Sequence, residues 1–169
     1  MNLFKEFQEI CEKLNRENIL PTLMGSVGLE YRSGIDWKPS DIDIHVPGDP
    51  RGWDAPDELR IYDWDKIYKI MTALGYKLID LHEHEFKKDN THVEFGTINS
   101  LSDFAGIKEE EIAIEELNNS RFRVPNLEQF LVIYQASSKD SYRNENNNNK
   151  DLPKIDWIES KLKSEQNEY

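Results

Sequence analysis

Cysteine is nearly absent from the 169-residue chain, which contains one, Cys11. A single cysteine forms no internal disulfide and supplies no cysteine-based zinc cluster. Cys11 shares an apolar stripe with Phe7, Ile10 and Leu14, at the three- and four-residue spacing of an amphipathic helix over residues 3–14. We therefore expect Cys11 to be a small core residue rather than a reactive thiol.

The chain also lacks an apolar run near the ~20 residues that a membrane-spanning helix needs. Glu6 falls where a signal peptide would have an unbroken apolar segment. These features predict a cytoplasmic protein that makes no membrane contact. The length fits one compact domain and is too short for a TIM barrel, which takes about 250 residues.

Positive charge is scarce, with 21 Lys and Arg against 33 Asp and Glu, a net charge of -12 and a pI near 4.8. Nucleic-acid binding draws on Lys and Arg that neutralise phosphates. An acidic surface therefore argues against bulk nucleic acid and anionic membranes as partners. The 4 Trp, 7 Tyr and 7 Phe argue against disorder, because they supply apolar surface for a core.

Hydrophobic spacing along the chain predicts helices that alternate with strands. We expect a single α+β domain over residues 1–169, with a small mixed β-sheet and helices packed on it. Its core covers about residues 1–117, and C-terminal helices follow in 118–169. The expected helices are 3–14, 26–31, 63–74, 109–117, 127–139 and 151–163; the expected strands are 19–24, 41–46, 76–83, 85–98 and an edge strand at 121–124. Loops are expected over 47–62 and 144–149, with a hairpin or short loop near 88–90.

The clearest strand carries two carboxylates. Side chains at i and i+2 of a strand share a face, about 6.5–7 Å apart at Cα, so Asp41 and Asp43 project together while Ile42 and Ile44 enter the core. Two such carboxylates can bracket one or two hard cations. A solvated acidic strand face is the alternative interpretation.

A Gly-Ser turn precedes this strand. Gly25 and Ser26 end the strand before it and open a short helix. Glycine allows close approach of a phosphate to the backbone, and a helix N-terminus offers unpaired N–H groups to anions. An anion-binding turn followed by paired carboxylates indicates a phosphate substrate with a metal ion.

With these motifs the sequence resembles the nucleotidyltransferase superfamily of the DNA polymerase β-like fold, in its minimal and antibiotic-modifying branches. The resemblance rests on Met24-Gly25-Ser26, a spacer over residues 27–40, and Asp41-Ile42-Asp43-Ile44. It implies a third carboxylate on a later strand, for which Glu94 in His92-Val93-Glu94-Phe95 is the candidate.

The resemblance extends to the C-terminal part, through Val124-Pro125 and Lys150-Asp151. A helix position that holds a lysine in many family members is Tyr134 here. Lys139, Arg143 or Lys150 is then left to meet the phosphates.

The resemblance implies a metal-dependent transfer of a nucleoside monophosphate from a nucleoside triphosphate to a small-molecule or protein acceptor. Asp41, Asp43 and Glu94 would be catalytic and hold Mg²⁺ or Mn²⁺, while Gly25, Ser26, Lys139 and Arg143 would bind the nucleotide. Acidity favours a cationic acceptor. Two alternatives stay open: a non-catalytic binding or regulatory module of the same fold, which Tyr134 and the long spacer favour, and a metal-dependent hydrolase.

Histidines give a weaker signal. His45 shares a face with Asp41 and Asp43, which allows a role as a third ligand or proton shuttle, although a partly exposed strand-end residue is the simpler interpretation. His82, His84 and His92 show no recognised zinc spacing, so we expect ordinary surface histidines.

Overall fold

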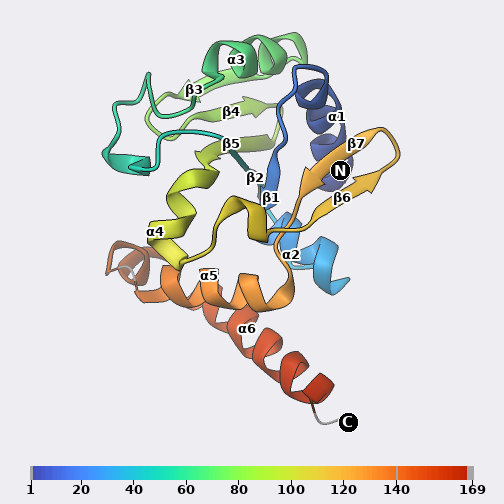
Figure 1. Ribbon diagram of the computed structural model, residues 1–169, viewed down its shortest axis with the longest axis vertical. Coiled ribbons are helices and arrows are strands. Elements are labelled where there is room, and N and C mark those ends of the chain that lie inside the picture. Colours follow the sequence, from blue (N-terminus) through green and yellow to red (C-terminus); the bar gives the residue numbers. More distant parts are fainter. Residues whose placement is uncertain (1, 140, 167–169) are drawn as a thin grey trace.

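The structure is a computed structural model that describes residues 2–139 and 141–166, with side chains described for 2–139 and 151–166. It is an α+β fold, as the sequence predicts, built on a mixed sheet of seven strands (Figure 1). The helices are α1 (Leu3–Arg16), α2 (Gly25–Ser33), α3 (Trp64–Ala73), α4 (Leu101–Ala105), α5 (Leu127–Lys139) and α6 (Ser141–Gln166). The strands are β1 (Thr22–Met24), β2 (Asp41–Val46), β3 (Lys77–Asp80), β4 (Glu85–Lys88), β5 (Thr91–Thr97), β6 (Ile114–Leu117) and β7 (Ser120–Arg123).

The sheet has the order β3-β4-β5-β2-β1-β7-β6. At its centre β2 runs antiparallel to β1 and parallel to β5, with Asp43 opposite Met24 on one side and Glu94 on the other. Directly opposite residues in neighbouring strands point to the same face. The register therefore brings the predicted carboxylates of β2 and β5 together.

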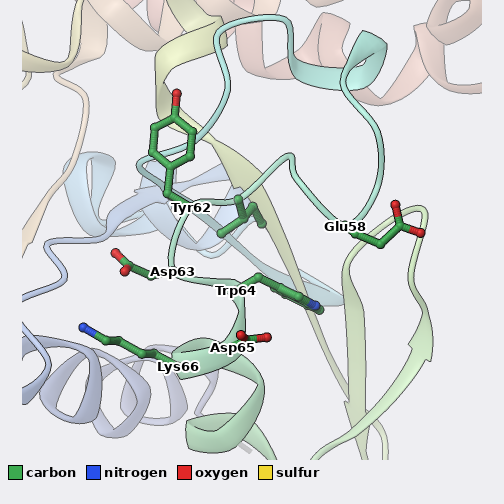
Figure 2. A pocket seen from close by; sticks show the side chains of 7 residues that line it. Glu58, Tyr62, Asp63, Trp64, Asp65 and Lys66 are labelled. Atoms are coloured by element: carbon green, nitrogen blue, oxygen red, sulfur yellow. The ribbon is translucent and has the colours of Figure 1, made fainter.

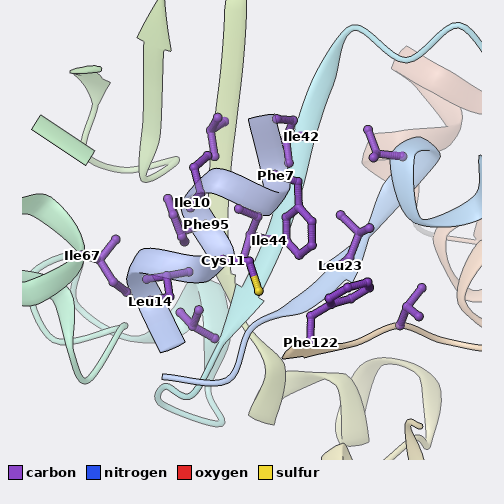
Figure 3. Close-up of a cluster of buried hydrophobic side chains, with 14 of the residues drawn as sticks. Phe7, Ile10, Cys11, Leu14, Leu23, Ile42, Ile44, Ile67, Phe95 and Phe122 are labelled. Carbon is purple, nitrogen blue, oxygen red and sulfur yellow. The ribbon is translucent and has the colours of Figure 1, made fainter. Parts of the chain in front are cut away.

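One face of the sheet is packed under α1 and α3. Ile42, Ile44 and Val46 of β2 are buried there with residues of both helices (Figure 3). Cys11 lies in this core, as expected, and burial raises the pKa of its thiol to about 12. The alternation of β2 consequently turns Asp41, Asp43 and His45 to the other face.

Two expected elements differ in the middle of the chain. The predicted strand over 85–98 is two strands, β4 and β5, joined by a hairpin at the predicted place near 88–90, where Asp89 adopts the left-handed conformation (φ +52°). The predicted helix over 109–117 is present only as a short 3-10 helix over Glu109–Glu111, because residues 114–117 form β6 and Asn118 (φ +56°) makes the turn into β7. Consequently β7 is an inner strand between β1 and β6 rather than an edge.

The C-terminal part is more helical than expected. The predicted loop over 144–149 is wrong, since the backbone is helical from Ser141 through Gln166, with Pro153 inside the helix. Asparagine has modest helix propensity, so tertiary packing of α6 along α5 outweighs it (Figure 1). No described helix is both long and apolar enough to cross a membrane. The boundary near residue 117 stays a prediction.

Candidate active site

Asp41 and Asp43 lie on the open face of the sheet, at the start of β2. Asp41 is exposed and Asp43 is partly buried. The sequence prediction of a shared face is met by the strand geometry, because Ile42 between them is fully buried.

The Gly25-Ser26 turn lies directly against Asp43. Gly25 has φ +63°, and a Cβ placed there would lie 3.1 Å from Asp43 Cβ and 3.5 Å from Asp43 Oδ2. Both the left-handed backbone and the close approach favour glycine. Gly25 also begins α2, and the N-cap residue Met24 makes no side-chain capping bond to the first N–H groups of this helix. Because Gly25 approaches Asp43 closely, the start of α2 lies beside that carboxylate.

Glu94 is the direct cross-strand partner of Asp43. Burial, followed by the charges of Asp43, Asp41, Glu83 and Glu85, raises the pKa of Glu94 to about 8. A carboxyl group with such a pKa holds its proton at neutral pH unless a cation is supplied. Burial and the clustered carboxylates therefore keep Glu94 uncharged at neutral pH in the absence of a cation.

Lys154 of α6 reaches the Gly-Ser turn, a position that the sequence reasoning missed. Its Nζ donates to Ser26 Oγ at 2.9 Å and lies 5.2 Å from the centre of the Tyr134 ring. Tyr134 stands on α5 at the position where the resemblance leads one to expect a lysine. The Lys154 ammonium group thus reaches the turn from α6, the helix next to α5. In the sequence, the only signal for such a residue was the absence of a lysine at position 134.

The other two predicted phosphate ligands are Lys139 and Arg143, and the structure describes the side chain of Lys139 alone. Lys139 is exposed at the last residue of α5, and within the described part of the chain it makes no hydrogen bond to Gly25 or Ser26. Arg143 lies in the segment 140–150, outside the described side chains. Both assignments stay predictions.

The donor set suits a hard divalent cation. Mg²⁺ and Mn²⁺ prefer oxygen ligands, and Asp41, Asp43 and Glu94 supply carboxylates that would exchange mutual repulsion for attraction to the ion. Among the described side chains, those of residues 2–139 and 151–166, no three His, Cys, Asp or Glu converge tightly enough to hold an ion as they stand. Coordination therefore requires these carboxylates to rotate toward one another.

His45 lies beside this group. Its Nε2 is 3.4 Å from Asp43 Oδ1, and its ring packs against Gly96, where a Cβ would come within 2.9 Å of Nε2. Gly96 on β5 thus leaves room for the imidazole next to Asp43.

A buried arginine, Arg60, connects the loop over 47–62 to the turn between β3 and β4 through hydrogen bonds. Arg60, 4% exposed, donates to Asp57 Oδ1 at 2.7 Å and to the carbonyl of His82, and it contacts His84 Nδ1 at 3.1 Å. His82 and His84 belong to the turn between β3 and β4, which also carries Glu83. His84 is fully buried, and burial together with the Arg60 charge lowers its pKa, so the prediction of a surface histidine is wrong there.

A surface pocket of about 270 Å³ lies where this loop enters α3 (Figure 2). It is lined by residue 58 and residues 61–66, with Asp65 near Trp64 and Asp63 pointing away from the indole. None of the predicted site residues lines it, so the candidate active site is the carboxylate face rather than this pocket.

The fold is similar to that of a solved nucleotidyltransferase structure. It resembles the solution structure of the antibiotic-resistance factor ANT(2'')-Ia, an aminoglycoside nucleotidyltransferase, with a TM-score of 0.55 over 98% of this chain and 95% of that chain, at 12% sequence identity. No protein-family model matches the sequence. The chain is 35% identical over 167 residues to the uncharacterized protein YnaI of Bacillus subtilis (strain 168), covering 97% of this chain and all of YnaI, and it belongs to the same family as YnaI.

Proposed function

We propose that the protein is a metal-dependent nucleotidyltransferase, which moves a nucleoside monophosphate from a nucleoside triphosphate to a small-molecule or protein acceptor. The observation that carries the proposal is the position of Asp43, in contact with the glycine that opens α2 and directly opposite Glu94 on β5. The likeness of the fold to ANT(2'')-Ia supports the same reaction class.

In this proposal the Gly25-Ser26 turn binds the terminal phosphates. The N–H groups at the start of α2 donate to phosphate oxygens, and the helix dipole favours the negative charge. Lys154 adds an ammonium group that Ser26 and the Tyr134 ring already hold at the turn, so little side-chain entropy is lost on binding.

Asp41, Asp43 and Glu94 would hold Mg²⁺ or Mn²⁺. Such an ion, when bound, offsets the charge that develops as pyrophosphate leaves. The pKa of Glu94 is raised to about 8, and once a bound cation has displaced its proton, Glu94 is the candidate to accept the proton of the attacking acceptor hydroxyl. Asp43, which lies against the turn, and its neighbour on the same strand face, Asp41, are the candidates to hold an ion that would neutralise the triphosphate.

Calorimetry with each of the four ribonucleoside triphosphates tests this proposal without knowledge of the acceptor. Binding is expected to need Mg²⁺ and to fall by at least about 100-fold in Asp43→Asn, because an amide is a poor ligand for a hard cation. Asp103→Asn, the same change at an exposed position on α4, serves as control and should bind like the wild type. Wild-type protein that binds none of the four triphosphates would refute the proposal.

The products distinguish transfer from its alternatives. A transferase releases pyrophosphate and leaves the α-phosphate label on the acceptor. A hydrolase releases the labelled nucleoside monophosphate into solution, and a non-catalytic module binds the triphosphate and returns it unchanged.

A further inference from the structure

A basic row continues from the carboxylates across the open face of the sheet. The strand register places Asp41 opposite His92, His92 opposite Lys87, and Lys87 opposite Lys77. Because directly opposite residues share a face, these side chains form one line from β2 to the edge strand β3. The two lysines stand two and three strands away from Asp41, about 10 and 15 Å at the usual strand spacing.

A cavity of about 320 Å³ lies at the lysine end of this row. Lys77, Lys87 and Ile79 line it, and the Ile79 side chain is 50% exposed. Lys88 also borders the cavity, but its ammonium group is engaged elsewhere, 3.6 Å from Glu6 and 4.7 Å from the centre of the Tyr76 ring. Lys77 and Lys87 are therefore the cations that face a molecule in this cavity, with Asp89 the opposing carboxylate in its lining.

The two lysines lie directly opposite one another on β3 and β4. Like charges directly opposite on neighbouring strands are destabilising. Within the described part of the chain neither Lys77 nor Lys87 makes a salt bridge, although the chain carries 33 acidic residues. Glu85, the acidic side chain two residues before Lys87 on the same face, is paired with His92 Nδ1 at 3.2 Å.

Protection of a sheet edge does not account for this pair. Edge strands carry lysines that discourage pairing with another chain, and that explains Lys77 on β3. Lys87, however, lies on β4, an inner strand between β3 and β5. A bound anion, which would pair with both ammonium groups, accounts for the pair.

We infer that this cavity binds the acceptor, and that the acceptor carries a dianionic group, such as a phosphate monoester, between Lys77 and Lys87. The inference rests on the proposed function. The acceptor would extend along the row so that its hydroxyl reaches Asp41 and Glu94 while its phosphate stays about 10 Å or more away. An acceptor that is cationic throughout, as the net charge suggests, would be repelled from this end of the site.

Side-chain ammonium NMR spectra test the subsite with methyl phosphate as the probe. The signals of Lys77 and Lys87, assigned from Lys77→Gln and Lys87→Gln, are expected to shift in a saturable way. Those of Lys66 and Lys69, two exposed lysines on α3, are expected to stay in place. Acetate, a monoanion, should bind at least about threefold more weakly.

Variants distinguish specific binding between Lys77 and Lys87 from nonspecific attraction of an anion to surface lysines. Lys77→Gln should weaken methyl phosphate binding at Lys87 by about tenfold, while Lys77→Arg, which keeps the charge, should weaken it by less than threefold. The double variant Lys66→Gln/Lys69→Gln, which removes the same net charge elsewhere, should leave binding unchanged. Equal shifts at all exposed lysines, or a Lys87 shift that survives in Lys77→Gln, would overturn the inference.

A second titration, with Mg²⁺ and a non-hydrolysable triphosphate present at saturation, links the subsite to the acceptor. Both ligands are expected to bind together, since they occupy different parts of the face. Displacement of methyl phosphate from the two lysines would assign them to the nucleotide and overturn the acceptor assignment. A protein that binds methyl phosphate there but no triphosphate would refute the proposed function and with it the acceptor role, leaving an anion site.

Discussion

Removal of the Glu94 charge is expected to stabilise the metal-free protein. Burial and the neighbouring carboxylates raise the pKa of Glu94 from 4.5 to about 8. Between these two pH values the folded state holds a proton that the unfolded state has lost, so Glu94 lowers stability as pH rises through this window. The penalty is complete above pH 8 and absent below pH 4.5.

The size of the effect follows from the same pKa. A difference of this size corresponds to about 5 kcal/mol above pH 8, at ~1.4 kcal/mol per pH unit. Glu94 is only partly buried and solvent screens its neighbours, so we expect about 2 kcal/mol. In a chain of this length that gain raises the melting temperature of Glu94→Gln by about 4–8 °C.

Thermal unfolding in a chelating buffer at pH 8.5 and at pH 4 measures this difference. Glu94→Gln should melt higher than the wild type at the alkaline pH and equally at the acidic one. Millimolar Mg²⁺ should stabilise the wild type more than the variant, because the cation offsets the charge that the variant lacks. Glu116→Gln on β6, where the side chain is 75% exposed, is the matched control and should change little. A Glu94→Gln variant that melts no higher than the wild type at pH 8.5 would refute the reasoning.

Three further substitutions test the phosphate turn and the loop. Lys154→Met should weaken triphosphate binding about tenfold or more, because a charge-assisted hydrogen bond is lost. Adding Tyr134→Lys should restore part of the binding, because it supplies an ammonium group from α5. Calorimetry measures both variants, and a double variant that binds no better than Lys154→Met would contradict the placement of Lys154. Gly25→Ala should cost about 1–3 kcal/mol in thermal or denaturant unfolding, because of its positive φ and the approach to Asp43, and a neutral result would show that the turn adapts. Arg60→Met should cost about 1–3 kcal/mol, since it leaves the His82 carbonyl without its donor and leaves Asp57 with the His82 ring alone. Proteolysis within 47–62 should then accelerate, and unchanged cleavage would show that other contacts hold the loop.

Strand β2 shows what the sequence makes predictable. Strict alternation of Asp41, Ile42, Asp43 and Ile44 fixes both the strand and its two faces, and the structure has the strand over the predicted residues. The Gly25-Ser26 turn was predictable for a similar reason, since glycine is demanded locally by a positive φ.

The elements that were mispredicted depend on distant contacts. Residues 114–117 have acidic and apolar residues that suit a helix or a strand, and pairing with β7 decides between them. The asparagine-rich segment before residue 150 carries no apolar periodicity, so its helix could not be read from the sequence.

The site residues that the sequence did not reveal are brought together by contacts between distant parts of the chain. Lys154 meets Ser26 across 128 positions of the sequence, and no local pattern marks it. The row from Asp41 to Lys77 exists only once the order β3-β4-β5-β2 is known. Sequence spacing therefore identifies the carboxylates, while the strand register and the packing of α6 identify the residues around them.

Electron paramagnetic resonance of Mn²⁺, recorded with and without a nucleoside triphosphate, tests most directly whether Asp41, Asp43 and Glu94 form a metal-nucleotide site. The account predicts that wild-type protein binds Mn²⁺ more tightly when the triphosphate is present, because the ion is shared between the carboxylates and the phosphates. It also predicts that Asp43→Asn loses this binding and Asp103→Asn keeps it. Mn²⁺ binding that is independent of both the triphosphate and Asp43 would contradict it.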